Sequence, residues 1–218
     1  MATPYFQLRQ DRVPSTQDVA REAIDLLPVL VIAAAQSAGR GRSGAEWLTA
    51  DRALAVSIAF HHDEGEDRPL SLMAGVVAAE ISAGASLKWP NDVMLGEEKV
   101  GGILVERSGD TTVVGLGLNL WWPEPPNGFG ALFDSDPGEH AYLEIGSLWG
   151  AELARMIASD GWPLERYQEL CATIGRRITW EPGGEGQAID VDRDGGLVVR
   201  TSDGAEVLYS GAVSHVRS

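Results

Sequence analysis

Four short apolar segments between residues 86 and 120 constrain the fold of this chain most strongly. They cover residues 86–89, 93–95, 100–107 and 112–120, and their pattern is typical of β-strands. The connections around Gly96-Glu97 and Ser108-Gly109-Asp110 are only a few residues long. Because parallel strands need a crossover of about a dozen residues, these connections predict hairpins and a mixed or largely antiparallel sheet.

Segments before and after this region predict further strands and the helices that cover the sheet. Three more strands are expected at residues 5–9, 29–35 and 53–60. Helices are expected at residues 15–27, 69–83, 148–158 and 164–173. Residues 121–146 are rich in Pro, Gly and Asp, and they predict a loop long enough to be functional or mobile.

From residue 177 onwards the texture of the sequence changes. Short alternating segments separated by Gly-rich turns occupy residues 178–180, 187–191, 197–200, 206–209 and 212–216. This pattern predicts a small β-barrel-like module. A chain of 218 residues can therefore hold one main domain with this module as an appendage.

Composition excludes several classes of function. The formal net charge of −15 argues against nucleic acid as a partner, because phosphate binding needs clustered Lys and Arg. Cys171 is the only cysteine, so neither an internal disulfide nor a Cys-rich metal site is expected. No stretch approaches the roughly 20 apolar residues of a membrane span, and the N-terminus lacks a basic, apolar signal. A cytoplasmic protein is therefore expected.

A glycine-rich loop, Gly39-Arg40-Gly41-Arg42-Ser43-Gly44, follows the buried strand expected at residues 29–35. Its glycines permit close approach of the backbone to a ligand, and its two arginines suit a phosphate or carboxylate. The loop lacks the Gly-Lys-Ser/Thr ending of the phosphate-binding loop of nucleotide hydrolases. The alternative interpretation is a solvated surface turn.

The chain contains only two lysines, Lys88 and Lys99, while its other fifteen basic residues are arginines. This usage indicates positions where a compact ammonium cannot be replaced by a planar guanidinium. Trp89-Pro90 ends a strand and presents Asn91 and Asp92 at its end, and Lys99 follows across a hairpin. A lysine, a carboxylate and an amide are thus expected to converge. The alternative is that both lysines are ordinary edge-strand charges and that Asp92 only forms a turn.

At these residues the chain resembles biotin protein ligases, which attach biotin to a lysine of carboxylase carrier domains. The resemblance rests on Ser15-Thr16-Gln17, residues 36–47, Lys88-Trp89-Pro90-Asn91-Asp92, residues 99–106 and residues 115–119. Residues 186–192 and 211–217 are similar to the family's SH3-like cap. The resemblance implies an α+β fold of the class II synthetase type, with a mixed sheet backed by helices. It places the biotin- and ATP-binding ligase domain at residues 1–175 and the SH3-like β-barrel at residues 176–218. Because no helix-turn-helix domain precedes Ser15, the monofunctional type is expected, without repressor activity.

The implied reaction has two steps. The biotin carboxylate attacks the α-phosphate of ATP, which is accompanied by Mg²⁺, and a lysine of a biotin carboxyl carrier domain of acetyl-CoA carboxylase or a related carboxylase then attacks the biotinyl-AMP. The resemblance allows a homodimer. It assigns catalytic roles to Lys99, Asp92 and Arg42, biotin binding to Ser15, Thr16, Gln36, Gly39, Arg40, Gly102 and Gly115, and nucleotide binding to Trp47, Lys88, Asn91, Asn119 and Arg217.

The sequence departs from the family pattern at Ala34-Ala35, at Glu46 and at residues 48–53, which puts the strength of nucleotide binding in question. Three rival functions stay open. A lipoate or octanoate ligase shares the fold and chemistry but lacks the block of residues 88–92, and a non-catalytic biotin sensor needs neither Lys99 nor Asp92. A plain interaction protein would leave the arginine loop without a purpose.

Two loops are expected to behave differently. The loop at residues 39–47 carries like charges on Arg40 and Arg42, which should repel each other until an anion neutralises them, so it is expected to order on ligand binding. Residues 121–146 hold enough aromatic and proline residues to pack against the body with or without ligand.

Overall fold

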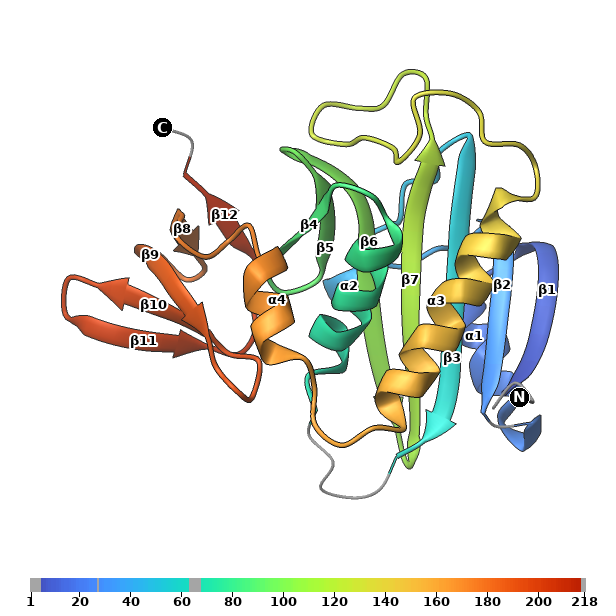
Figure 1. The fold of residues 1–218 in the computed structure, drawn as a ribbon, viewed down its shortest axis with the longest axis horizontal. Helices are drawn as coiled ribbons and strands as arrows, with labels where there is room; N and C mark the ends of the chain where they lie inside the picture. Colours follow the sequence, from blue (N-terminus) through green and yellow to red (C-terminus); the bar gives the residue numbers. More distant parts are fainter. Residues whose placement is uncertain (1–4, 27, 63–67, 217–218) are drawn as a thin grey trace.

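The fold is centred on a seven-stranded mixed sheet, in a computed structural model that describes residues 5–26, 28–62 and 68–216 (Figure 1). The strands have the order β1-β2-β3-β7-β6-β5-β4, in which β1 and β2 pair in parallel and all other neighbours pair antiparallel. Their bounds are β1 Phe6–Val13, β2 Val29–Gln36, β3 Arg52–His61, β4 Ala85–Lys88, β5 Asp92–Leu95, β6 Glu98–Ser108 and β7 Thr111–Trp121. The predicted mixed sheet and its hairpins are confirmed.

Helices cover both faces of this sheet. Their bounds are α1 Thr16–Glu22, η1 Ile24–Leu26, η2 Arg42–Gly44, α2 Leu70–Ile81, α3 Ala141–Ile157 and α4 Leu164–Leu170, where η marks a 3₁₀ turn. In Figure 1, α2 and α3 cross the front of the sheet, and α1 lies behind it. Strand β2 is apolar on both faces because Val29 and Val31 pack with Ala20 of α1, whereas Leu30 and Ile32 pack under α3.

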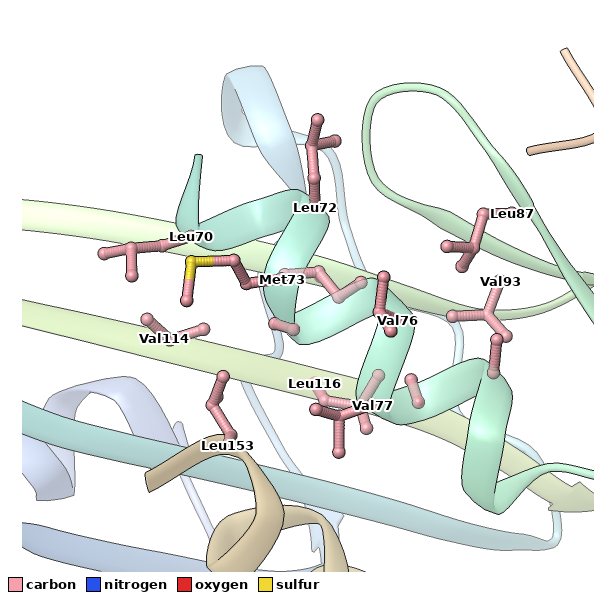
Figure 2. Packing of buried hydrophobic residues seen from close by; sticks show 14 of the residues in the cluster. Leu70, Leu72, Met73, Val76, Val77, Leu87, Val93, Val114, Leu116 and Leu153 are labelled. Carbon is pink, nitrogen blue, oxygen red and sulfur yellow. The ribbon is translucent and has the colours of Figure 1, made fainter. Parts of the chain in front are cut away.

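The main core lies between the sheet and helices α2 and α3 (Figure 2). Met73 and Val77 of α2 point at Val114 and Leu116 of β7, and Leu153 of α3 packs beside them. Each such fully buried side chain contributes roughly 1.5–3 kcal/mol. Since side chains alternate along a strand, β7 directs Val114 and its three leucines into this core and its glycines to the opposite face. That opposite face carries the site.

The start of helix α3 differs from the sequence-based expectation. The helix begins at Ala141, whereas a loop reaching residue 146 and a helix from residue 148 were expected. Gly146 and Gly150 lie on the face packed against the sheet, where a Cβ at Gly150 would stand 2.5 Å from Leu30 Cδ2. These glycines permit close packing and do not mark a loop. Helices α1 and α4 end earlier than expected, at Glu22 and Leu170. The expected ends were residues 27 and 173, and residue 27 lies outside the described residues.

The C-terminal module is a separate five-stranded antiparallel sheet of order β11-β10-β9-β8-β12. Its strands are β8 Arg177–Trp180, β9 Gly184–Val191, β10 Leu197–Thr201, β11 Gly204–Leu208 and β12 Val213–His215. Trp89, at the cis Trp89-Pro90 bond, connects it to the main sheet. Its main-chain N–H donates to Thr173 Oγ1 and its indole N–H to Gly195 O, both at 3.0 Å. The strand pattern expected for this module is confirmed.

The loop between β7 and α3 packs on the main sheet, as its composition predicts. Leu132 N–H donates to Asn119 O, and Gly130 N–H donates to Lys99 O, both at 3.0 Å. Phe129 contacts Trp122 with ring centroids 6.3 Å apart. Within the parts of the chain that the structure describes, no helix combines the length and the apolar character needed to cross a membrane.

Candidate functional site

Two adjoining cavities open on the face of the sheet that carries α1. The inner cavity has a volume of about 30 Å³ and the outer one about 730 Å³. Four residues line both cavities and form the wall between them: Arg40, Trp47, Gly102 and Leu104. The inner cavity is the smaller of the two, and it is lined mainly by polar side chains and by glycines of the sheet.

A chain of hydrogen bonds orders the polar groups of the inner cavity. Thr16 donates to Gln36 Oε1 through both its main-chain N–H, at 2.7 Å, and its hydroxyl, at 3.1 Å. Ser57 Oγ lies 2.8 Å from Thr16 Oγ1. Because the Thr16 hydroxyl has one proton, which it gives to Gln36, the Ser57 hydroxyl donates to Thr16. The lone pairs of Ser57 and the amide N–H groups of Gln36 remain for a ligand.

Glycines in β6 and β7 make room for Trp47. A Cβ at Gly117 would lie 2.7 Å from Trp47 Cζ2, and one at Gly102 would lie 3.3 Å from Trp47 Cζ3 and 3.6 Å from Lys99 Nζ. The indole therefore lies directly against the backbone of the sheet. The absence of a side chain at Gly102 leaves room for both Trp47 and Lys99.

Lys99 and Asp92 meet in the outer cavity. Lys99 Nζ lies 2.5 Å from Asp92 Oδ1, and their side chains are 29% and 21% exposed. Lys88 pairs in register with Asp92 across the β4–β5 turn and lines the same cavity. The cavity walls carry four cations, Arg40, Arg42, Lys88 and Lys99, against two carboxylates, Glu46 and Asp92. A locally basic cavity in a chain of charge −15 favours an anionic ligand.

The glycine-rich loop forms a flap, defined here as residues 37–47, over both cavities. Gly41 N–H donates to Ala45 O at 2.7 Å, and Trp47 N–H donates to Gly39 O at 3.1 Å, so the flap is a small hairpin. The 3₁₀ turn η2 forms its tip. From this tip, Arg42 donates to Asn91 Oδ1 at 3.1 Å and more weakly to Gly211 O at 3.4 Å. The flap thus spans the outer cavity from the main sheet to the C-terminal module.

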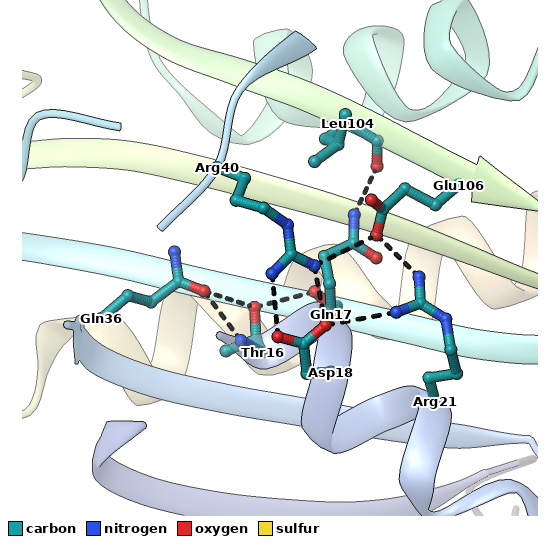
Figure 3. Close-up of polar contacts among 9 residues, drawn as sticks. Thr16, Gln17, Asp18, Arg21, Gln36, Arg40, Leu104 and Glu106 are labelled. Carbon is teal, nitrogen blue, oxygen red and sulfur yellow. Dashed lines mark hydrogen bonds and ion pairs between the residues drawn. The ribbon is translucent and has the colours of Figure 1, made fainter. Parts of the chain in front are cut away.

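Arg40 is tied to two carboxylates (Figure 3). Its guanidinium donates to both oxygens of Asp18, at 2.8 and 2.7 Å, and lies 3.5 Å from Glu106. Arg21 completes a ring of four charges, at 2.7 Å from Glu106 and 3.2 Å from Asp18. The hydrogen bond from Arg40 lowers the pKa of Asp18. The premise that Arg40 and Arg42 repel each other without ligand is wrong, because Asp18 and Glu106 already compensate Arg40.

The structure brings most of the predicted site residues together. The inner cavity is lined by Ser15, Thr16, Gln36, Arg40, Trp47, Gly102 and Gly115, and the outer one by Arg40, Arg42, Trp47, Lys88, Asn91, Asp92, Lys99 and Gly102. Gly39 and Asn119 line neither cavity. Gly39 lies against Gln36 and Trp47, and buried Asn119 donates to Gly130 O while its Oδ1 has no partner. Arg217 lies outside the described residues.

Sequence reasoning assigned no site role to two polar residues of the inner cavity. Ser57 is fully buried in β3, where it is the only polar side chain in the apolar run at residues 53–60. A single serine in such an apolar run is a signal from which a site role could have been predicted. Gln17 is also buried, donates to Leu104 O at 2.9 Å and has an unpartnered Oε1. Gln17 belongs to the Ser15-Thr16-Gln17 motif, but nothing in the sequence indicates which way its side chain points.

Two family profiles match the chain. The biotin/lipoate A/B protein ligase family matches residues 10–120, which supply all lining residues of both cavities except Phe129 and residues 210–213. The biotin protein ligase C terminal domain matches residues 173–216.

Individual proteins give a consistent result. The biotin–[acetyl-CoA-carboxylase] ligase of Mycobacterium tuberculosis is 32% identical over 91% of this chain and 83% of its own length. The bifunctional ligase/repressor BirA of Escherichia coli is 40% identical over 102 residues, which are 41% of this chain and 32% of BirA. Among solved structures, the biotin protein ligase of Aquifex aeolicus in complex with biotin and ATP superposes with a TM-score of 0.83 at 26% identity, covering 98% of this chain and 99% of that one. The chain belongs to the biotin/lipoate A/B protein ligase family, with the C-terminal domain of biotin protein ligases.

Proposed function

We propose that this chain is an ATP-dependent biotin protein ligase that forms biotinyl-5'-AMP and transfers biotin to a lysine of a carrier domain. The observation that carries the proposal is the Lys99–Asp92 pair, which faces a basic cavity next to a polar pocket whose one charged lining residue, Arg40, is compensated by Asp18 and Glu106. Joining two anions needs a cation between them, and the neighbouring pocket suits an uncharged head group. The family membership and the ligand-bound relatives support the same activity.

The inner cavity offers a complementary pattern to the ureido ring of biotin. A ureido group has two N–H donors and one carbonyl acceptor and carries no charge. Ser57 Oγ keeps lone pairs for an N–H, and the amide N–H groups of Gln36 can donate to the carbonyl. Ser15 lines the same cavity and supplies a further hydroxyl. The fixed hydrogen-bond chain therefore presents donors and acceptors before the ligand arrives.

The residues of the outer cavity can support adenylation. The biotin carboxylate attacks the α-phosphorus of ATP, the bond to the pyrophosphate breaks, and a mixed anhydride forms. The Lys99 ammonium between the two anions offsets their repulsion and stabilises the charge of the transition state. Arg42 leaves its uncharged partners, Asn91 Oδ1 and Gly211 O, to meet the phosphate. It then closes the flap over the anhydride, so that water is excluded.

Nucleotide contacts are proposed for Trp47, Lys88, Asn91 and Asn119, and also for Arg217, which lies outside the described residues. The buried Oδ1 of Asn119 has no hydrogen-bond partner, and an adenine N–H that reached it would supply one. Among the described residues, no group of three or more His, Cys, Asp or Glu side chains is placed to hold a metal ion. Mg²⁺ is proposed to enter with ATP, because this ion commonly binds substrate phosphates.

The second step uses Asp92. The amine of the carrier lysine attacks the anhydride carbonyl, AMP leaves, and Asp92 orients the amine or takes its proton. The partner proposed is a biotin carboxyl carrier domain of acetyl-CoA carboxylase or a related carboxylase, in the cytoplasm, where ATP is available. Nucleic acid is not proposed, because of the acidic charge. The resemblance keeps a homodimer as a prediction, which sedimentation would test.

The rival activity in the same family is lipoate or octanoate transfer. The hydroxyl and amide groups of the inner cavity disfavour it, because an alkyl chain or dithiolane ring would leave them unpaired. A biotin sensor without chemistry is disfavoured by the Lys99–Asp92 pair. The deciding assay supplies ATP and Mg²⁺ with biotin or lipoate and measures pyrophosphate release. Release with biotin alone supports the proposal, and release with lipoate alone contradicts it.

A further inference from the structure

We infer that Asp18 and Glu106 are positioning residues that fasten the base of the flap, through Arg40, before any ligand is bound. Neither side chain lines the inner or outer cavity, and neither has a role in the two reaction steps. The identity of the ligand rests on the proposed function, but the behaviour of the flap in the free protein does not.

The fastening joins the flap to two rigid elements. Asp18 lies in the first turn of α1, which packs on the sheet through buried Ala20, and Glu106 lies in β6. An isolated, half-exposed ion pair contributes little to stability. Here the Asp18–Arg40 contact is bidentate, and Glu106 and Arg21 link both ends into one ring (Figure 3). Shared, bidentate hydrogen bonds of this kind restrict direction as well as distance.

The two arginines of the flap therefore have different roles. Arg40 is compensated by carboxylates and forms part of the wall between the cavities. Arg42 contacts only uncharged oxygens among the described residues, so an anion can draw it away at little electrostatic cost. Movement is thereby confined to the 3₁₀ tip, Arg42–Gly44, which contains Gly44 at φ +77°. The base stays in place and keeps the inner cavity walled.

Removing the Asp18 carboxylate should release the base. Ligand binding must then first order the flap, so the apparent affinity falls by the fraction of molecules with an ordered flap. The KM for biotin in biotinyl-AMP formation should rise about tenfold in Asp18→Asn, while kcat changes less than about twofold. Asp18→Glu, which keeps the charge, should recover most of the loss. Glu106→Gln should have a smaller effect, since Glu106 is the more distant partner of Arg40.

Hydrogen exchange in the ligand-free protein tests the inference directly. The Gly41 and Trp47 amides, which close the flap hairpin, should exchange at least about fivefold faster in Asp18→Asn and in Arg40→Gln. The amides of the double variant should exchange no faster than those of either single variant, because both substitutions remove the same Asp18–Arg40 interaction. Glu152→Gln, which removes the carboxylate of the exposed Arg155–Glu152 ion pair, is the matched control and should change the exchange rate of neither amide. Amides of β3 report whether each variant is folded.

Unchanged exchange of both amides in a folded Asp18→Asn variant would overturn the inference. So would additive effects in the double variant, or an unchanged KM for biotin in an otherwise active enzyme. If the wild type forms no biotinyl-AMP, the proposed function fails, whereas the exchange experiment still decides whether Asp18 fastens the flap.

Discussion

Lys99 Nζ contacts Asp92 Oδ1 at 2.5 Å across the β5–β6 hairpin, at the wall of the outer cavity. Lys99→Ala should slow biotinyl-AMP formation by roughly two to three orders of magnitude, the scale for losing one electrostatic partner of a transition state. Lys99→Arg should recover little, because the planar guanidinium does not replace a compact ammonium. Pyrophosphate release under single-turnover conditions measures both, and near-normal release by Lys99→Ala would refute the assignment.

Arg42→Gly should still make biotinyl-AMP but lose it to solvent. The flap tip would no longer reach Asn91 and Gly211, so the anhydride would be less well enclosed. Biotinylation of a bystander protein, such as serum albumin, measures the escape. A variant that leaks no more adenylate than the wild type contradicts the role of Arg42 as a lid.

Gly150→Ala should destabilise the fold by about 1–3 kcal/mol, because the added methyl would meet Leu30 at 2.5 Å in a packed core. Urea unfolding measures the change in the free energy of unfolding. Arg155→Gln, on the exposed side of the same helix, should stay within about 0.5 kcal/mol of the wild type. Equal stability of the Gly150→Ala variant and the wild type would show that α3 packs less closely than described.

His215 should make the protein less stable as the pH decreases. Burial, and then the nearby charges of Lys88 and Arg176, lower its pKa in the folded protein, and its Nε2 lies 3.1 Å from Thr173 Oγ1. The unfolded chain binds the proton first as the pH drops below about 6.5, so this contribution is full above that pH and is lost below it.

The comparison variant is His215→Gln, which should lose less of its unfolding free energy than the wild type between pH 7 and pH 5. His140→Gln, at an exposed residue, should lose as much as the wild type. Parallel pH profiles of His215→Gln and the wild type would exclude this contribution.

The sequence predicted those features that depend on local patterns. Alternation and short turns predicted the strands and hairpins of residues 86–120, and the two lysines indicated the pair that meets Asp92. The predicted start of α3 was wrong because a glycine such as Gly146 locally indicates a loop. In the structure, Gly146 allows the helix to approach Ile32 closely, and only the tertiary fold defines that contact.

Long-range partners could not be predicted in the same way. Asp18 lies in the first turn of α1, a common position for a carboxylate, and nothing local connects it to Arg40, 22 residues later, or to Glu106. Compensation of Arg40 by these groups is a property of the folded sheet. The expected repulsion between Arg40 and Arg42 failed for this reason.

The central claim is that this chain activates biotin with ATP and delivers it to a carrier lysine. The most direct test incubates the purified protein with biotin, ATP and Mg²⁺, measures biotinyl-AMP and pyrophosphate in one turnover, and then adds a biotin carboxyl carrier domain. The account predicts equal amounts of biotinyl-AMP and pyrophosphate, followed by biotin on one carrier lysine and release of AMP. Tight biotin binding without pyrophosphate release, or adenylation of lipoate in place of biotin, would contradict it.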